Sequence, residues 1–201
     1  HHSLALSREY ARRFARRLEP RLDAILAPFA SAEIAFLETD VPIVYTSDAT
    51  FERQVDYHPG FSGLDPGYRA EGDEVERRAL ERAALIVYPS EWAAESAREY
   101  YGIQADKVHV VPFGANLETV TDRDEIEAAK AGPTCRILFL GVNWERKGGD
   151  VAYEAARILR ERGLDVRFTV CGSVPPTPLD PSFARVIPRL DKRRPEAERE
   201  L

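Results

Sequence analysis

One loop of this sequence holds the residues whose types and spacing are best suited to chemistry. It spans residues 141–148, between an apolar run at 136–140 and a helical pattern at 149–162. Glycines at a helix start let backbone N–H groups approach an anion, and the helix dipole adds to the attraction. Arg146 offers a planar fork to phosphate oxygens, and Lys147 offers a compact charge. The spacing predicts a phosphate or diphosphate site, and a solvated turn with incidental basic residues is an equally supported alternative.

Other nucleotide or metal signatures are absent from the sequence. The loop lacks the Lys-Ser/Thr ending of a Walker A motif, and no G-x-G-x-x-G occurs, so a dinucleotide site lacks support. Asp122 and Asp124 spell D-x-D within an acidic run, which favours a solvated charge cluster over a metal site. The two cysteines, Cys135 and Cys171, have neither zinc-site spacing nor enough members for a disulfide framework. No metal is expected.

The elements that must position this loop alternate between strands and helices. Strands are predicted at 24–27, 43–46, 85–88, 108–111, 136–140, 166–171 and 186–187. Helices are predicted at 3–19, 74–84, 91–101 and 149–162, with a short helix or apolar turn at 34–37. This alternation predicts βαβ units and an α/β fold with parallel sheets. Ligands bind such sheets at the carboxyl ends of the strands, where the 141–148 loop lies.

Three further segments complete the chain's organisation. Residues 51–72 are rich in glycine, proline and aromatic residues and predict a long loop. Residues 112–133 predict an interdomain connection. The arginine-rich helix at 3–19 favours a solvated face over contact with an anionic membrane surface, because glutamates dilute its charge.

Composition narrows the class of protein. The chain has 201 residues, 44% of them hydrophobic, and a formal net charge of -6. The acidic balance argues against a nucleic-acid partner, which would require a clustered basic surface. No stretch approaches the roughly 18 consecutive apolar residues of a membrane span. We expect a cytoplasmic protein with at most peripheral membrane contact.

Four segments in order resemble the group 1 (family 4) retaining glycosyltransferases: 87–94, 110–116, 141–149 and 168–172. The resemblance covers residues 24–187. It implies a GT-B fold, in which a nucleotide-sugar donor lies between two Rossmann-like domains. It places the C-terminal part of the N-terminal, acceptor-side domain at 1–113, the connection at 114–133 and the start of the donor domain at 134–201. Each domain is expected to be incomplete, so that the chain corresponds to the central portion of such an enzyme.

The resemblance also assigns donor-binding residues. Arg146 and Lys147 match the basic pair that holds the donor diphosphate and stabilises the leaving nucleotide, a role that suits their charge. Gly141, which lets the donor approach the strand end, and Gly148 complete the diphosphate-binding set. The stretch 171–173, with Gly172 at its centre, lies where the family's loop approaches the nucleoside base.

Residues of the acceptor side and the cleft follow from the same resemblance. Gly114 and Asn116 match the segment that lines the cleft floor. Asp48 follows a strand of the first domain, where many relatives have a histidine that touches the sugar, and it is the candidate catalytic residue. The alternative for Asp48 is a loop carboxylate that caps Thr50 or a nearby backbone N–H.

The implied function is transfer of a sugar from a nucleoside-diphosphate sugar to an acceptor hydroxyl, with retention and without a metal or cofactor. The acceptor is a carbohydrate, lipid or small molecule. The alternative is a non-catalytic module that binds a nucleotide or diphosphate. The family's Glu-x7-Glu motif is expected downstream of residue 201, because Glu91 and Glu99 have its spacing but lie on a helix of the first domain.

Overall fold

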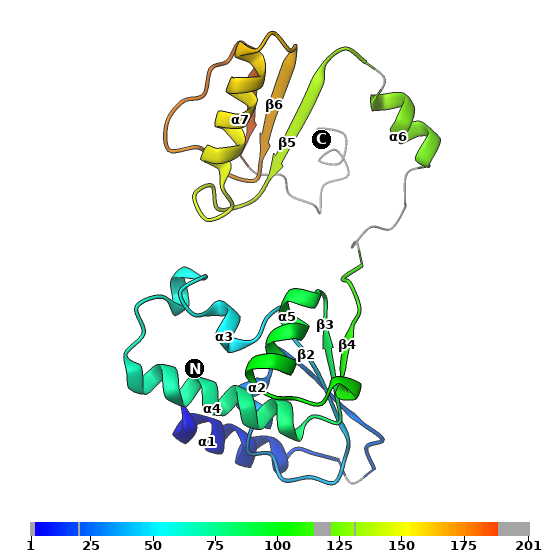
Figure 1. Cartoon of the computed structure of the whole chain (residues 1–201), viewed down its shortest axis with the longest axis vertical. Coiled ribbons are helices and arrows are strands. Elements are labelled where there is room, and N and C mark those ends of the chain that lie inside the picture. Colours follow the sequence, from blue (N-terminus) through cyan, green and yellow to red (C-terminus); the bar gives the residue numbers. More distant parts are fainter. Residues whose placement is uncertain (1–2, 20, 115–121, 131, 189–201) are drawn as a thin grey trace. The chain divides into compact units, whose positions relative to one another are not determined.

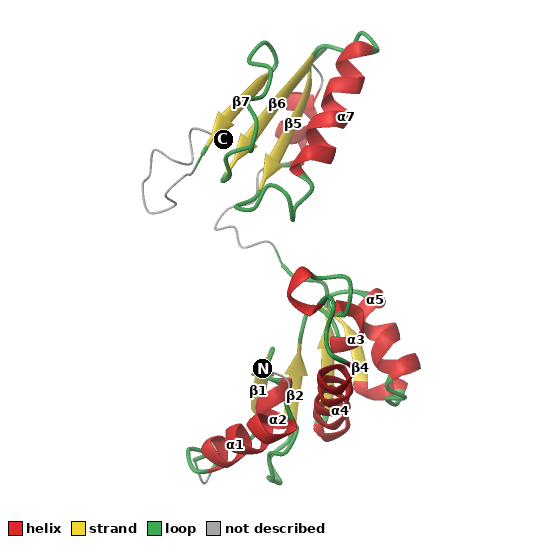
Figure 2. Ribbon diagram, turned by 90° about the vertical axis from the view of Figure 1, so that its left-hand side faces the viewer, coloured by secondary structure: helices red, strands yellow, loops and turns green. Residues whose placement is uncertain are grey.

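The computed structural model describes residues 3–19, 21–114, 122–130 and 132–188. The chain divides between residues 116 and 117 into two compact units. Each unit contains one parallel sheet with helices packed on it (Figures 1 and 2). This confirms the predicted α/β class with two Rossmann-like sheets, each of them short. The predicted domain limits at 113 and 134 remain predictions.

The first sheet has the strand order β1-β2-β3-β4, and all neighbours are parallel. Its strands are β1 (Ile25–Pro28), β2 (Ile43–Thr46), β3 (Leu85–Tyr88) and β4 (Val108–Val110). β3 lies between β2 and β4, and its Ile86 and Tyr88 side chains are fully buried. All four strands were predicted to within one residue at each end, because β-branched and apolar runs of this length are typical of buried parallel strands.

The helices of this unit pack on the sheet and against one another. They are α1 (Leu4–Ala15), α2 (Ser31–Ile34), α3 (Phe51–Gln54), α4 (Pro66–Arg82) and α5 (Glu91–Glu95), with short helical turns η1 (Pro59–Phe61), η2 (Ser96–Tyr100, a π turn) and η3 (Ala105–Lys107). α4 packs against α1, α2 and α3, and α5 packs against β3 and β4. α1 ends four residues earlier than predicted. None of the helices in the described part of the chain combines the length and apolarity needed to cross a bilayer.

The prediction of one long loop at 51–72 is wrong. The segment contains α3, η1 and the first turns of α4. α4 begins at Pro66, where the missing N–H costs nothing in a first turn, and Asp65 caps the helix by accepting a hydrogen bond from the Gly67 amide at 2.8 Å. This capping signal lies within a glycine- and proline-rich stretch, which is why composition alone predicted a loop.

A buried polar cluster anchors α3 although the helix has only four residues. Thr50 is fully buried, caps the helix and lies 2.7 Å from the Ser96 hydroxyl. Ser96 donates to the Glu52 carboxylate at 2.8 Å, and the Tyr101 hydroxyl accepts from the Glu52 amide at 3.1 Å. These bonds connect α3 to the helical segment after β3.

The second unit has the strand order β5-β6-β7, again parallel. Its elements are α6 (Arg123–Lys130), β5 (Cys135–Leu140), α7 (Gly149–Glu161), β6 (Val166–Cys171) and β7 (Ala184–Ile187). α7 packs on β5 and β6, and Figure 2 shows it along one face of the sheet. The buried core includes Phe168 and Val170 of the central strand β6. The segment 112–133, predicted as an interdomain connection, contains the unpredicted helix α6. The amide of Asp124 in its first turn donates to the Asp122 side chain.

Candidate functional site

The loop between β5 and α7 leads into a helix without a side-chain cap. Gly148 is the N-cap of α7 and has the left-handed backbone φ of 71°. Within the described residues, the backbone amides of Asp150 and Val151 have no backbone acceptor. These unsatisfied donors and the helix dipole favour an anion at this end of α7.

The two basic residues predicted to bind diphosphate lie on this loop and are exposed. The Asn143 side chain accepts from the Arg146 amide at 2.9 Å, and the Asn143 carbonyl accepts from the Lys147 amide at 3.2 Å. These bonds fix the turn and leave both basic side chains outside it. Neither side chain forms an ion pair or hydrogen bond with any residue that the structure describes. Both cations are therefore available to a ligand.

Packing brings the predicted glycines to the same end of the sheet. The β and γ carbons of Lys147 lie 3.5 and 3.4 Å from the position of a Cβ on Gly141. Gly172 follows β6 with a φ of 96°, and a Cβ there would lie 3.1 Å from the Gly141 carbonyl oxygen. Only glycine combines this backbone conformation with so close an approach. The structure thus places Gly141, Gly172 and the basic loop together.

Ser173 belongs to the stretch 171–173 that the resemblance places near the nucleoside base. Ser173 is buried, and its Oγ has no hydrogen-bond partner within the described residues. A buried hydroxyl without a partner is costly, so it indicates a polar group supplied from elsewhere. Its position directly after a parallel strand was the available sequence signal.

Three other predicted residues precede the division between the two units. Gly114 is exposed, and Asn116 lies outside the described residues. Asp48 follows β2 and is exposed, and within the described part of the chain its side chain forms no hydrogen bond. The alternative predicted for Asp48, a hydrogen bond to Thr50 or to a nearby backbone N–H, is therefore not formed within the described residues. The Thr50 hydroxyl instead caps α3.

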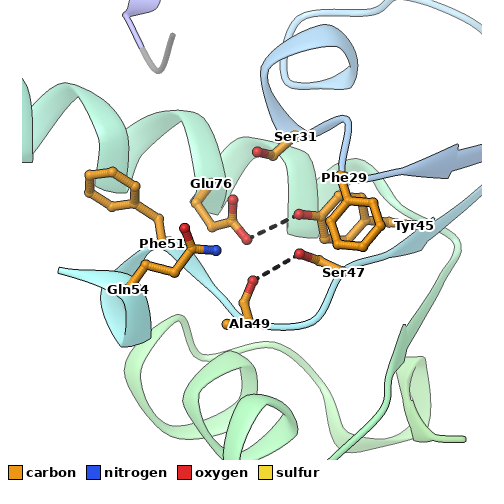
Figure 3. A pocket seen from close by; sticks show the side chains of 8 residues that line it. All are labelled: Phe29, Ser31, Tyr45, Ser47, Ala49, Phe51, Gln54 and Glu76. Atoms are coloured by element: carbon orange, nitrogen blue, oxygen red, sulfur yellow. Dashed lines mark hydrogen bonds between the residues drawn. The ribbon is translucent and has the colours of Figure 1, made fainter. Parts of the chain in front are cut away.

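The first unit contains a cavity that the sequence did not reveal, at the carboxyl ends of β1 and β2 (Figure 3). Its volume is about 200 Å³. Its polar lining comes from Ser31, Tyr45, Ser47, Gln54 and Glu76. Phe29, Ala49 and Phe51 complete the wall. The lining therefore combines elements α2, β2, α3 and α4 with the segments that follow β1 and β2.

Glu76 is the buried carboxyl group of this cavity. Its side chain projects from α4 toward Tyr45 and Ser31 (Figure 3), and the Tyr45 hydroxyl donates to Glu76 Oε1 across a long 3.4 Å. Burial raises the pKa of Glu76 to about 7, against the opposing effect of hydrogen bonds from Ser31 and Tyr45. Burial, with the nearby Glu76 carboxyl, also raises the pKa of Tyr45 well above its ordinary value. The sequence signal was a glutamate next to Val75, on the apolar face of a helix.

Comparison with known proteins finds similarity to glycosyltransferases. Residues 1–119 match the family described as "Glycosyltransferase Family 4". The chain is similar to a "D-inositol 3-phosphate glycosyltransferase" of Paenarthrobacter aurescens, with 29% identity over 168 residues. It is also similar to the protein of the same name from Pseudarthrobacter chlorophenolicus, with 28% identity over 183 residues.

The two alignments extend beyond the family match. They cover 79% and 86% of this chain but 40% and 42% of the relatives. The chain thus spans about two fifths of the length of the curated relatives it matches. The family match covers more than half of the chain, including all of the first sheet. By this match, the chain belongs to glycosyltransferase family 4.

Proposed function

We propose that this chain supplies the diphosphate-binding loop of a glycosyltransferase that moves a sugar from a nucleoside-diphosphate sugar to an acceptor hydroxyl. The observation that carries the proposal is the pair Arg146 and Lys147, exposed and unpaired within the described residues, ahead of the uncapped start of α7. Family membership supports sugar transfer, and this loop supports a diphosphate as the group that leaves.

The chemistry of the loop fits the charge that develops during transfer. As the bond from the sugar to the diphosphate breaks, negative charge accumulates on the departing phosphate oxygens. Lys147 supplies a point charge, Arg146 supplies paired N–H donors, and the amides of Asp150 and Val151 add partial positive charge. Donors placed before the reaction stabilise the transition state without reorganising. Two cations also neutralise the diphosphate, which supports transfer without a metal.

The stereochemistry and the fold of the whole enzyme belong to the same proposal. Retention of the anomeric configuration and the GT-B arrangement rest on the family resemblance. The donor would bind at the carboxyl ends of β5 and β6, with Gly172 and Ser173 on the side of the nucleoside base. The acceptor would bind to the first unit, where Asp48 is exposed. Both relatives are named for D-inositol 3-phosphate, a phosphorylated cyclitol, which makes cyclitols, with or without a phosphate, one candidate acceptor class.

Titration calorimetry of the 201-residue chain with UDP, GDP and ADP tests the donor site. Lys147→Ala and Arg146→Ala should each raise the dissociation constant roughly ten- to a hundredfold, the scale of a hydrogen bond to a charged group. Arg162→Ala is the matched control, since it removes one exposed charge from the opposite end of α7. Unchanged affinity in the Lys147 and Arg146 variants would refute the site. Diphosphate binding by an enzyme containing this chain, without sugar transfer, would favour the non-catalytic alternative.

A further inference from the structure

The cavity of the first unit has a lining suited to hydroxyl groups. The Gln54 amide can both donate and accept, and Glu76 accepts. The Ser31 and Ser47 hydroxyls can accept, because Ser47 already donates to the Ala49 carbonyl at 2.9 Å and Ser31 donates to Glu76. A ligand with several hydroxyls on one ring needs such mixed partners in several directions. The cavity of about 200 Å³ is smaller than the ~300–1,000 Å³ sites of drug-sized ligands. Its size suits a single ring rather than an oligosaccharide.

An aromatic ring lies at the same cavity. Phe29 is 62% exposed although it lines the cavity, so one side of its ring remains available. Its backbone φ is 55°, an uncommon value for a bulky residue. The Phe29 amide bonds to the Thr46 carbonyl at 2.8 Å, which holds the turn after β1 against β2. An aromatic face beside hydroxyl partners is suited to the C–H face of a sugar or cyclitol.

The charges around the cavity disfavour an anion. Glu76 is the ionisable carboxyl in the lining, and Asp73 adds negative potential from the same helix. Within the described residues, the lining contains no lysine, arginine or histidine. The arginine of α3, Arg53, donates to the Trp92 carbonyl at 3.2 Å and pairs with Glu52, so it is engaged elsewhere. A phosphate group placed here would be desolvated without a cation to compensate it.

We propose that this cavity binds the acceptor as an uncharged polyhydroxylated ring, a sugar or cyclitol, and that Glu76 excludes phosphorylated acceptors. The inference rests on the proposed function, because it assigns an acceptor class to the first unit. It does not depend on any residue of the proposed diphosphate loop. The acceptor cavity and the diphosphate site can therefore be tested separately.

Amide NMR spectra of the isotope-labelled 201-residue chain test the proposal at about pH 8, where Glu76 is ionised because its pKa is about 7. The probes are myo-inositol, glucose and mannose, and the monophosphate ester of each, added to ~50 mM so that weak millimolar binding is detected. At least one uncharged compound should shift the amides of Ser31, Ala49 and Gln54. Its monophosphate should require at least about tenfold higher concentrations for the same shifts, a difference near 1.4 kcal/mol.

Three variants separate the exclusion of monophosphates from the binding of the uncharged ring. Glu76→Gln keeps the shape of the side chain and should reduce the discrimination to less than about threefold. Glu81→Gln, an exposed position on the same helix, should leave it unchanged. Gln54→Leu should weaken binding of the uncharged ring about three- to tenfold, the loss of an ordinary hydrogen bond. It also tests the site if Glu76→Gln does not fold.

Two results would overturn the inference. One is the absence of shifts at these amides with any uncharged probe, and the other is a monophosphate that binds as tightly as its parent compound. UDP added to the same sample should shift the amides of Gly148 and Gly149. Shifts there without shifts at the cavity would leave the proposed function in place and refute the acceptor class alone.

Discussion

Trp144 lies so close to Gly149 that a Cβ atom on the glycine would be 2.3 Å from the Cδ2 atom of the indole. The ring is buried and also packs on Phe139, with ring centroids 5.1 Å apart. The start of α7 is thereby held against β5 through the tryptophan. The position of the loop at 141–148 accordingly depends on this packing contact.

We expect Gly149→Ala to destabilise the second unit by about 1–3 kcal/mol, because the methyl group overpacks a filled contact. Hydrogen exchange at the β6 amides, which reports opening of this unit, measures the effect. Gly132→Ala is the control, since no described atom lies within 4 Å of a Cβ there. Equal exchange in the two variants would contradict the contact.

Salt should weaken diphosphate binding in a way that depends on the exposed cations. The Debye length shortens from about 8 Å at physiological ionic strength to about 3 Å at 1 M. We expect UDP affinity to fall as salt rises, with a shallower dependence in the Arg146→Ala/Lys147→Ala double variant. Calorimetry over a salt series measures both slopes. A double variant with the slope of the unaltered chain would show that other charges attract the ligand.

Glu76 should make the stability of the first unit depend on pH. Its pKa rises from the ordinary 4.5 to about 7 in the folded chain. Between these values the unfolded chain releases the proton and the folded chain keeps it, so the unfolding free energy falls as pH rises. The decrease is complete above about pH 7 and is on the order of 3 kcal/mol at most. Glu76→Gln should remove it.

Urea unfolding at a series of pH values measures this effect. In a Trp144→Phe background, Trp92 is the remaining tryptophan of the sequence, and its fluorescence reports the first unit. The difference in unfolding free energy between this background and the same background with Glu76→Gln isolates the glutamate from other titrating groups. A difference that stays constant between pH 4.5 and 7 would show that Glu76 titrates normally.

Asp48 offers a test of function without a change of fold. It is exposed and, within the described residues, forms no side-chain bond, so Asp48→Asn should change stability by less than about 0.5 kcal/mol. If Asp48 contacts sugar or acceptor, the same substitution should slow transfer by an enzyme that contains this chain. Melting curves together with a transfer assay separate the two effects. A large loss of stability would assign Asp48 a structural role instead.

The strands and α7 could be predicted because each has a local signal. The runs at 43–46 and 85–88 are short, apolar and β-branched, and Gly148 and Gly149 mark the start of α7. The basic pair was also visible from the sequence, since it lies in the loop directly after an apolar strand, where ligands bind such sheets.

The cavity could not be predicted, because its residues become neighbours only in the folded chain. Ser31, Tyr45 and Glu76 come from three separate elements. Along α4, Glu76 stands among many charged residues, and its position beside Val75 is too weak a signal by itself to predict the burial that the fold shows. Similarly, the helix α6 was not predicted within the connection, because an acidic run occurs both in linkers and in the first turns of helices.

The short helix α3 has a consequence for the order of folding. A helix of four residues cannot form alone, since even isolated helices of about 12–15 residues are marginal in water. It requires Thr50 to meet Ser96, a contact between residues 46 positions apart. The part of the cavity wall that contains Gln54 therefore forms only after β3 and the segment following it have packed in place. Substitutions at Gln54 should accordingly leave the refolding rate nearly unchanged and act mainly on the unfolding rate.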